Sequence, residues 1–226
     1  GSTGLGAGQF NSPIGITIDA ANQLYVVDQA NARVQGFDLG GNVLTTFGTF
    51  GTGIGQFLTA WDIAAAPDGT LWVTDLGNNT VQNVTSTGTF LSWFGGPGSG
   101  TGQFQGAGGI AIDEGGALWV TDGNGGNRVQ GFNAAGTFLR QFGSIGTGRG
   151  QFNQPIGIAA GISGTLWVVD AGNNTVQRFT SAGSWLLTAG SGGAGHGQFN
   201  APFGIATGAS NLFWVVDQNN QRVQQF

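Results

Sequence analysis

The chain has 226 residues, of which 39% are hydrophobic and 46 are glycine, and this composition suits an ordered domain with many turns. Only 8% of the residues are charged, against roughly 25% in typical soluble domains. The net charge is −5, all six basic residues are arginine, and none of them cluster, so we expect neither a nucleic-acid partner nor an anionic membrane surface. The sequence has no cysteine, which excludes disulfides and thiolate metal ligands, and no apolar run approaches the ~18 residues of a membrane span.

One tripeptide divides the chain into five repeats. Gly-Gln-Phe begins at residues 8, 55, 102, 150 and 197, so its spacings are 47, 47, 48 and 47 residues. Periods of about 40 to 50 residues with several strand-like segments are typical of propeller blades, each a four-stranded antiparallel sheet. We therefore predict one all-β domain over residues 1–226, with repeats at 8–54, 55–101, 102–149, 150–196 and 197–226.

Each repeat follows the same order of elements. A short turn after the tripeptide leads to an inner strand, and a second strand ending in Asp follows. An Asn/Gly-rich turn then leads to a third strand with a Val-Gln pair, and an outer strand such as 42–47 or 137–142 ends the blade. The β-branched and aromatic residues alternate with period two, which indicates strands throughout and no helix. The second strands are 24–28, 71–75, 118–122, 166–170 and 213–217, and the third strands are 33–37, 80–84, 128–132, 175–179 and 222–226.

These segments carry a resemblance to a known family. The order Pro-x-Gly-Ile-x-x-Asp, Leu-Trp/Tyr-Val-x-Asp, Asn-x-Arg-Val-Gln-x-Phe and Phe-Gly-x-x-Gly-x-Gly-x-Gly-Gln-Phe resembles the NHL repeat over essentially the whole chain. The resemblance implies a β-propeller of five blades. Propellers similar to NHL repeats include RNA-binding modules, protein-interaction modules, lyases and extracellular bacterial proteins, so the resemblance alone does not fix a function.

The fifth repeat stops at the end of its third strand. Residues 1–10 match only the loop that follows an outer strand, so nineteen blade strands are expected and one outer strand is missing. An unpaired strand edge can accept a strand from another chain. We therefore hypothesise an interface for a donated strand along the last five residues. The alternative is that this sequence is a piece of a longer protein, with six blades for example. The interface residues are Arg222, Val223, Gln224, Gln225 and Phe226.

An aspartate ends the second strand of every repeat. A carboxylate at the start of an Asn/Gly turn can accept backbone N–H bonds, and it can pair with the arginine that follows in three repeats. Because the same residue recurs in each blade, we interpret the set as structural turn residues and not as catalytic groups. They are Asp28, Asp75, Asp122, Asp170 and Asp217, and the arginines are Arg33, Arg128 and Arg222.

Most of the tryptophans occupy one repeated position. An aromatic residue at a repeated strand position most simply fills the space between neighbouring blades. Core packing is therefore expected at this position, with sugar stacking as the alternative. Trp93 and Trp185 lie instead on outer strands, where they are better candidates for exposed contacts. The repeated position holds Tyr25, Trp72, Trp119, Trp167 and Trp214.

Departures from the repeat supply the remaining candidates for chemistry. Trp61 and Asp62 stand at the start of an inner strand, Trp61 where the first repeat has Ile14 and Asp62 where the other four repeats have glycine, so they form a weak candidate ligand-binding site near a channel mouth. One carboxylate is not an acid/base pair. His196 is the only histidine, and catalytic zinc typically needs three protein ligands. We therefore predict no catalytic residue, no metal site and no cofactor.

These observations favour a non-catalytic interaction or assembly scaffold that binds a protein partner or a second copy of itself. The lysine-free surface rich in Asn, Gly and Thr is compatible with an extracellular or cell-surface prokaryotic protein. Two alternatives stay open. One is a lyase or hydrolase acting at the channel mouth, and the other is a carbohydrate-binding propeller that uses aromatic residues at its rim.

Overall fold

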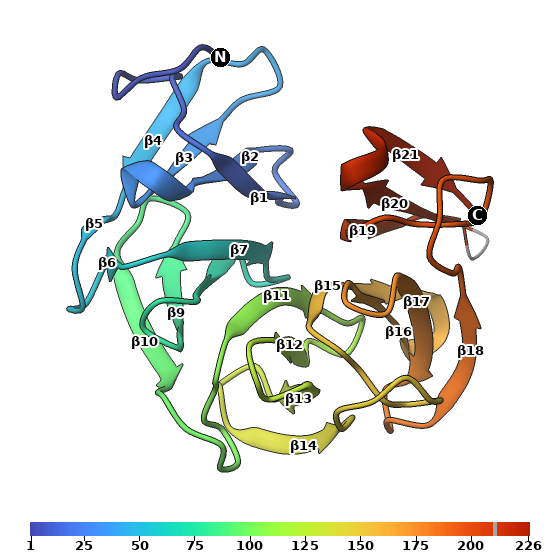
Figure 1. The fold of residues 1–226 in the computed structure, drawn as a ribbon. Coiled ribbons are helices and arrows are strands. Elements are labelled where there is room, and N and C mark those ends of the chain that lie inside the picture. Colours follow the sequence, from blue (N-terminus) through green and yellow to red (C-terminus); the bar gives the residue numbers. More distant parts are fainter. Residues whose placement is uncertain (210–211) are drawn as a thin grey trace. The chain divides into compact units, whose positions relative to one another are not determined.

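The computed structural model describes residues 1–209 and 212–226, and strands joined by turns make up most of them (Figure 1). Five antiparallel blades follow one another along the chain, so the predicted all-β, five-bladed propeller fold is confirmed. The nineteen blade strands expected from the repeat are all present in the described residues. The chain divides into two compact units, Gly1–Ile110 and Ala111–Phe226. A single domain over the whole chain stays a prediction.

Unit 1 contains the first two blades, in which the strands pair in chain order from the inner to the outer edge. A short parallel pair, β5 (Thr49–Phe50) and β6 (Gln56–Phe57), lies in the loop between them. Phe57 of this loop packs with Tyr25, Val34 and Leu71 in the core of the unit. The first blade consists of β1 (Pro13–Ile18), β2 (Leu24–Asp28), β3 (Arg33–Phe37) and β4 (Val43–Phe47). The second consists of β7 (Ala60–Ala65), β8 (Thr70–Asp75), β9 (Thr80–Thr85) and β10 (Phe90–Gly95).

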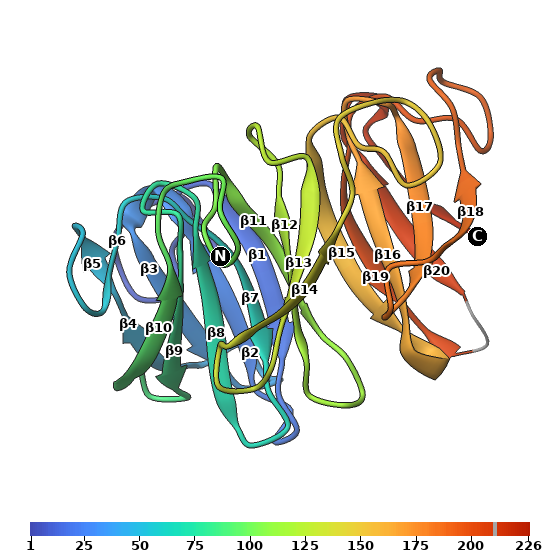
Figure 2. The same ribbon diagram turned by 90° about the horizontal axis from the view of Figure 1, so that it is seen from below.

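Unit 2 contains most of the third blade together with the fourth and the fifth. Figure 2 shows strands of the fourth and fifth blades side by side, and the inner strands of these two blades are in contact. The third blade has β11 (Ala107–Ile112), which begins in unit 1, and β12 (Leu118–Asp122), β13 (Arg128–Phe132) and β14 (Phe138–Phe142). The fourth has β15 (Pro155–Gly161), β16 (Thr165–Asp170), β17 (Thr175–Thr180) and β18 (Trp185–Ala189). The fifth has β19 (Pro202–Thr207), β20 (Phe213–Asp217) and β21 (Arg222–Gln225).

The outer strand of each four-stranded blade is irregular at one repeated leucine. The pairing register with the third strand shifts there, so the leucine is a bulged residue, and its side chain is exposed. Bulges on edge strands disturb the regular row of backbone groups that another strand would need for pairing. The outer edges of these blades are therefore poor templates for a further strand. The leucines are Leu44, Leu91, Leu139 and Leu186.

The expectation of no helix needs a small correction. Three short 3-10 helices occur in the described residues, two of them in the turn after a second strand. There the chain ends the 3-10 turn with a non-glycine residue at positive φ, Ala32 in the first blade and Gln221 in the fifth. No helix in the described part of the chain has the length and apolar character needed to cross a membrane. The 3-10 helices are η1 (Gln29–Asn31), η2 (Ile162–Gly164) and η4 (Gln218–Asn220).

Candidate functional site

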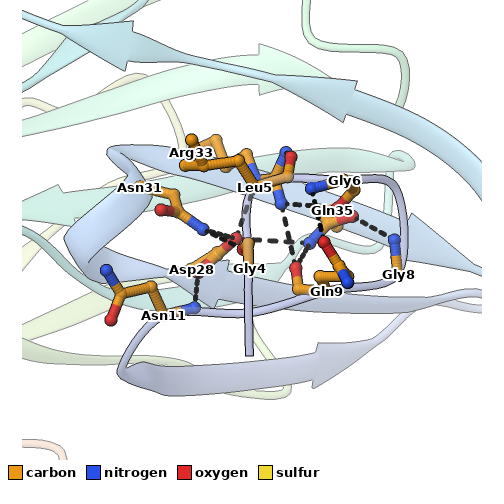
Figure 3. A network of polar contacts seen from close by, with 10 residues as sticks. All are labelled: Gly4, Leu5, Gly6, Gly8, Gln9, Asn11, Asp28, Asn31, Arg33 and Gln35. Carbon is orange, nitrogen blue, oxygen red and sulfur yellow. Dashed lines mark hydrogen bonds and ion pairs between the residues drawn. The ribbon is translucent and has the colours of Figure 1, made fainter. Parts of the chain in front are cut away.

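Asp28 is the centre of a polar network at the end of strand β2 (Figure 3). Its side chain is wholly buried. The backbone N–H of Asn11 donates to Asp28 Oδ1 over 2.6 Å, and the side chains of Asn31 and Arg33 donate to Oδ2 over 2.8 and 2.7 Å. Gln35 Nε2 adds a bond of 3.3 Å to the same oxygen. The buried carboxylate therefore has a donor on each oxygen, which is what a structural turn residue requires.

Arg33 extends this network to the loop that carries the repeat tripeptide. Its guanidinium donates to the carbonyl oxygens of Leu5, Gly6 and Gln9 at 2.7 to 3.0 Å. The loop before the inner strand is thus held against the third strand of the same blade. Since the carbonyl groups accept from a cation that is itself paired, the loop is fixed without a ligand.

The same role recurs in the other repeats, so the interpretation of the five aspartates as turn residues agrees with their contacts. Arg128 pairs with Asp122 at 3.0 Å and Arg222 with Asp217 at 2.8 Å. In the second and fourth blades threonine replaces the arginine, and Asn78 and Asn173 donate to the carboxylates of those blades.

The arginine changes the acidity of this carboxyl group. Burial raises the pKa of Asp170 above its ordinary value, and hydrogen bonds from Asn153, Asn173 and Gln177 offset the effect only in part. Burial also raises the pKa of Asp217, but hydrogen bonds from Asn200 and Asn220 and the Arg222 guanidinium outweigh it, so the net shift is downward. The pKa of the aspartate at this repeat position is therefore raised in the fourth blade and lowered in the fifth.

Two repeated glutamines contribute to this framework, and the sequence reasoning assigned them no role. Gln9 of the tripeptide accepts from Gly6 N–H at 2.9 Å and so closes its own loop. Gln35 on the third strand accepts from Gly8 N–H and donates to the Gln9 carbonyl oxygen. The signal was present, because both glutamines recur in all five repeats. Their positions are Gln9, Gln56, Gln103, Gln151 and Gln198 in the loops, and Gln35, Gln82, Gln130, Gln177 and Gln224 on the strands.

Trp61 and Asp62 lie on strand β7, and their surroundings are structural. Asp62 Oδ1 accepts from Ile63 N–H at 2.9 Å, and Oδ2 accepts from Ile110 N–H on β11 at 3.0 Å. Burial raises the pKa of Asp62 from 3.8 to about 6, while these two N–H groups lower it in part. A Cβ at Gly15 of β1 would come within 3 Å of Asp62, so glycine there allows the close approach. Asp62 thus links the inner strand of its blade to that of the next one.

The aromatic residues are distributed largely as expected. Tyr25, Trp72, Trp119 and Trp167 are buried, whereas Trp214 of the fifth blade is half-buried. The Trp119 indole N–H also donates to Asp113 Oδ2 at 2.8 Å, and Asp113 receives two turn N–H groups on its other oxygen. Trp93 on β10 is 55% exposed, and Trp185 on β18 is half-buried. Core packing at the repeated position therefore holds in the blades that have four strands.

His196 lies exposed in the loop before the fifth blade. No group of three or more His, Cys, Asp or Glu side chains with the geometry of a metal site occurs among the residues that the structure describes. Glu114 and Asp113 border a broad hollow at the inner-strand turns of unit 2, but Asp113 is already engaged in its turn. None of these places brings an acid, a base and a nucleophile together.

Strand β21 has a hydrogen-bonded neighbour only on one side within the described residues. Phe213 and Phe226 exchange both of their backbone hydrogen bonds at 2.9 and 3.1 Å, and Gln224 faces Val215 two positions along the ladder. Because antiparallel ladders alternate, the N–H and C=O groups of Val223 and Gln225 point to the other side of the strand. Among the described residues no strand pairs with this side of β21, and the interface along it stays a prediction.

The comparisons with known proteins agree with this architecture. The model of the NHL repeat matches residues 10–37, 57–82, 104–132 and 152–179. The chain belongs to the NHL-repeat family. The four matches run from the tripeptide loop to the third strand of the first four repeats, which are the parts of the NHL repeat that the aspartate network connects. No curated protein matches the sequence.

Several solved propellers are similar to this NHL-repeat chain in fold. A catalytically inactive histidine-to-alanine form of virginiamycin B lyase from Staphylococcus aureus, solved with quinupristin, is 20% identical with a TM-score of 0.67, covering 95% of this chain and 69% of that one. A streptogramin B lyase is 17% identical with a TM-score of 0.66, over 96% and 83%. A chain of a nidogen/laminin complex is 19% identical with a TM-score of 0.59, over 79% and 64%. At these identities the likeness shows the fold alone.

Proposed function

We propose that this NHL propeller is a non-catalytic, extracellular interaction or assembly module that accepts a β-strand from another protein chain along β21. The observation that supports this proposal is the unpaired side of β21. In the four complete blades the third strand is paired on both sides, whereas in the fifth blade the outward N–H and C=O groups of Val223 and Gln225 have no strand beside them in the described residues. Open edges of this kind are the usual place for strand addition.

The side chains of β21 also favour an added strand. Val223 is 62% exposed, although the valine at the same repeat position is wholly buried in every other blade. In the first three blades this valine pairs with a phenylalanine of the outer strand, and in the fourth Val176 pairs with Ala189. A donated strand with an apolar residue opposite Val223 would therefore cover apolar surface as well as pair the backbone.

The edge of β21 is regular where the other outer edges are not. Leu44, Leu91, Leu139 and Leu186 form bulges that disturb the outer strands of the complete blades. The described register of β21 with β20 runs from Asp217 and Arg222 to Trp214 and Gln225 without a shift. The fifth blade thus offers the straight edge that strand addition needs.

The alternative of an enzyme at the inner strands has less support. Both oxygens of Asp62 already accept backbone N–H groups, and no second titratable group is bonded to it in the described residues. Fold neighbours include lyases as well as a chain of the nidogen/laminin complex, so the fold favours neither class. The geometry of β21 therefore supports the proposal of an interaction role.

A peptide with the chain's own outer-strand sequence tests the edge. We expect a labelled peptide of residues 137–142 to bind the 226-residue chain saturably, with fluorescence anisotropy as the readout. Gln225→Pro removes one outward N–H and leaves the ladder with β20 intact, because proline fits an edge strand on its free side. We expect this variant to bind the peptide at least tenfold more weakly, while Gln225→Ala stays within twofold of the parent.

A second experiment, in the source organism, identifies the polypeptide that donates the strand. A photo-crosslinking amino acid in place of Val223 should join the protein to a separate polypeptide, and surface labelling of intact cells should reach it if the protein is extracellular. Peptide binding that is equal in the proline and alanine variants would contradict the edge. Crosslinks confined to one and the same chain would show that the protein completes its own blade, and would contradict donation by a partner.

A further inference from the structure

A groove on the second blade lies beside the framework described above, and Trp93 and Ile54 in its lining have no part in that framework. It has a volume of about 330 Å3 and lies between the loop before β7 and the face of strands β9 and β10. Trp93 forms one wall, and it is on the same face of the sheet as Gln82, its cross-strand partner. Ile54 of the loop, which is 67% exposed, borders the groove with Pro97.

The groove is open because two repeat positions differ from those of the other blades. Arg33 and Arg128 begin the third strands of the first and third blades, and their guanidinium groups lie over the corresponding space, where Arg33 bonds the loop carbonyls and Arg128 donates to Gln141. The second blade has Thr80 at this position, and Trp93 stands where the third blade has Gln141. The second blade thus has a short threonine side chain in place of the long arginine. It also has the large ring of Trp93 in place of the smaller Gln141 side chain.

The fourth blade shows what the loop residue can do. It also begins its third strand with a threonine, but Arg149 occupies the loop position of Ile54. The Arg149 guanidinium lies 4.5 Å from the centre of the Trp185 ring, and the Trp185 indole N–H donates to Thr188. In that blade the ring and its N–H are satisfied from within the chain. Trp93 has no such cation beside it among the residues that line the groove.

We propose that this groove binds a sugar ring of a neutral carbohydrate. The apolar C–H face of a pyranose packs against an exposed indole face, which is the contact that Trp93 offers. The hydroxyl groups of Thr52 and Thr80 line the same groove and have no hydrogen-bond partner in the described residues, so they are available to sugar hydroxyls. None of the described lining residues is charged, which favours a neutral ligand over an acidic one.

The size and polarity of the groove support a sugar over an apolar peptide side chain. About 330 Å3 lies at the small end of ligand pockets and suits one or two sugar units. An apolar side chain would cover Trp93 and Ile54 but leave the threonine hydroxyls without partners, at a cost that a sugar avoids. This inference concerns β10 and the loop at residues 52–54, so it can fail or hold independently of strand addition at β21.

Four neutral trisaccharides serve as probes: cellotriose, maltotriose, mannotriose and triacetylchitotriose. We expect at least one to bind the 226-residue chain saturably in calorimetry and to show saturation-transfer signals from its ring protons. Trp93→Ala should weaken that binding at least tenfold. Trp185→Ala, which removes the other outer-strand tryptophan, should change it less than twofold. Ile54→Arg keeps the indole and fills the groove, and it should also weaken binding at least tenfold.

Thermal melting of all three variants keeps the result interpretable, because a variant that melts with the parent has kept its fold. No binding of any of the four probes at millimolar concentration would overturn the proposal, as would binding that is unchanged in Trp93→Ala. Selection of a peptide that binds the parent and not Trp93→Ala, with no sugar bound, would assign the groove to a protein partner instead.

Discussion

The fourth and fifth blades of unit 2 contain the same first three strands, and among the described residues only the fourth has an outer strand beside them. Val176 on β17 is wholly buried, packed with Phe199 and Phe213 of the fifth repeat, whereas Val223 on β21 is 62% exposed. Yet the backbone pairing is the same, from Asp170 opposite Thr175 and from Asp217 opposite Arg222. The turn network therefore sets the hairpin of each blade, while the outer strand and the next repeat supply its burial.

The largest effect is expected at the turn aspartates. Asp170→Ala leaves the Asn153 N–H without its acceptor at a buried site and removes one of the two acceptors of the Asn173 and Gln177 amide groups, so we expect a loss of about 3 kcal/mol in the free energy of unfolding. Asp217→Ala should cost less, about 1–2 kcal/mol, because water can reach the groups freed at the open blade. Urea denaturation of both variants measures the difference. Equal losses would show that the open edge does not admit water to this network.

The inner strands give a second test, because the fourth and fifth blades have Gly157 and Gly204 where the second has Asp62. The pKa of Asp62 is raised in the folded chain, so its contribution to stability is complete at low pH and is lost as the pH rises from 3.8 to about 6. A rise of this size corresponds to at most about 3 kcal/mol, and the partial exposure of Asp62 reduces it to about 1–2 kcal/mol.

Asp62→Asn isolates that contribution. The unfolding free energy of the parent minus that of the variant should fall by about 1–2 kcal/mol between pH 4 and pH 6.5, and stay constant above. Urea unfolding at several pH values measures it, and Asp68→Asn in an exposed turn of the same blade is the control. A difference that does not change with pH would mean that Asp62 titrates at its ordinary value.

The exposed and the buried valine give the third test. Val176→Ala removes two methyl groups from a packed core and should cost about 1–2 kcal/mol in the free energy of unfolding. Val223→Ala removes them from a mostly exposed side chain and should cost less than about 0.5 kcal/mol. If an added strand covers β21, the cost of Val223→Ala should rise toward that of Val176→Ala when the peptide of residues 137–142 is present.

The repeat made most of this fold predictable from the sequence. Gly-Gln-Phe and the Asp at the end of each second strand set the register of every blade, so the strand order and the buried aromatic position follow from spacing. The division into Gly1–Ile110 and Ala111–Phe226 has no signal of this kind, because the repeat continues across it.

The groove at Trp93 could be predicted only in part. An exposed tryptophan on the outer strand follows from the two-residue alternation of β10. The hollow beside it depends on a loop 39 residues earlier, at Ile54, and on the absence of an arginine at Thr80. Aligned repeats show these substitutions, but the space that they leave depends on side-chain packing, which spacing does not specify. The bonds of Asp62 to Ile63 and Ile110 were likewise beyond the reach of the pattern.

The smallest effect concerns the sign of the pH dependence at the repeated aspartate. The pKa of Asp170 is raised by burial, so its contribution to stability is present at low pH and is lost as the pH rises above its ordinary value of 3.8. The pKa of Asp217 is lowered, since its hydrogen bonds and Arg222 outweigh burial, and its contribution is present above that value and is lost as the pH falls.

The pH dependence of each contribution is measured with asparagine variants of both residues, from the free energy of unfolding between pH 2.5 and pH 6. The free energy of unfolding of the parent minus that of Asp170→Asn should fall with rising pH. The corresponding difference between the parent and Asp217→Asn should rise with pH. Arg222→Thr gives the fifth blade the threonine that the fourth blade has at this position. We expect the pH dependence of the Asp217 contribution to become more like that of Asp170 in this variant. If the slope at Asp217 is unchanged in Arg222→Thr, then backbone and amide donors alone set its acidity, and the arginine serves only to hold the carbonyls of the loop.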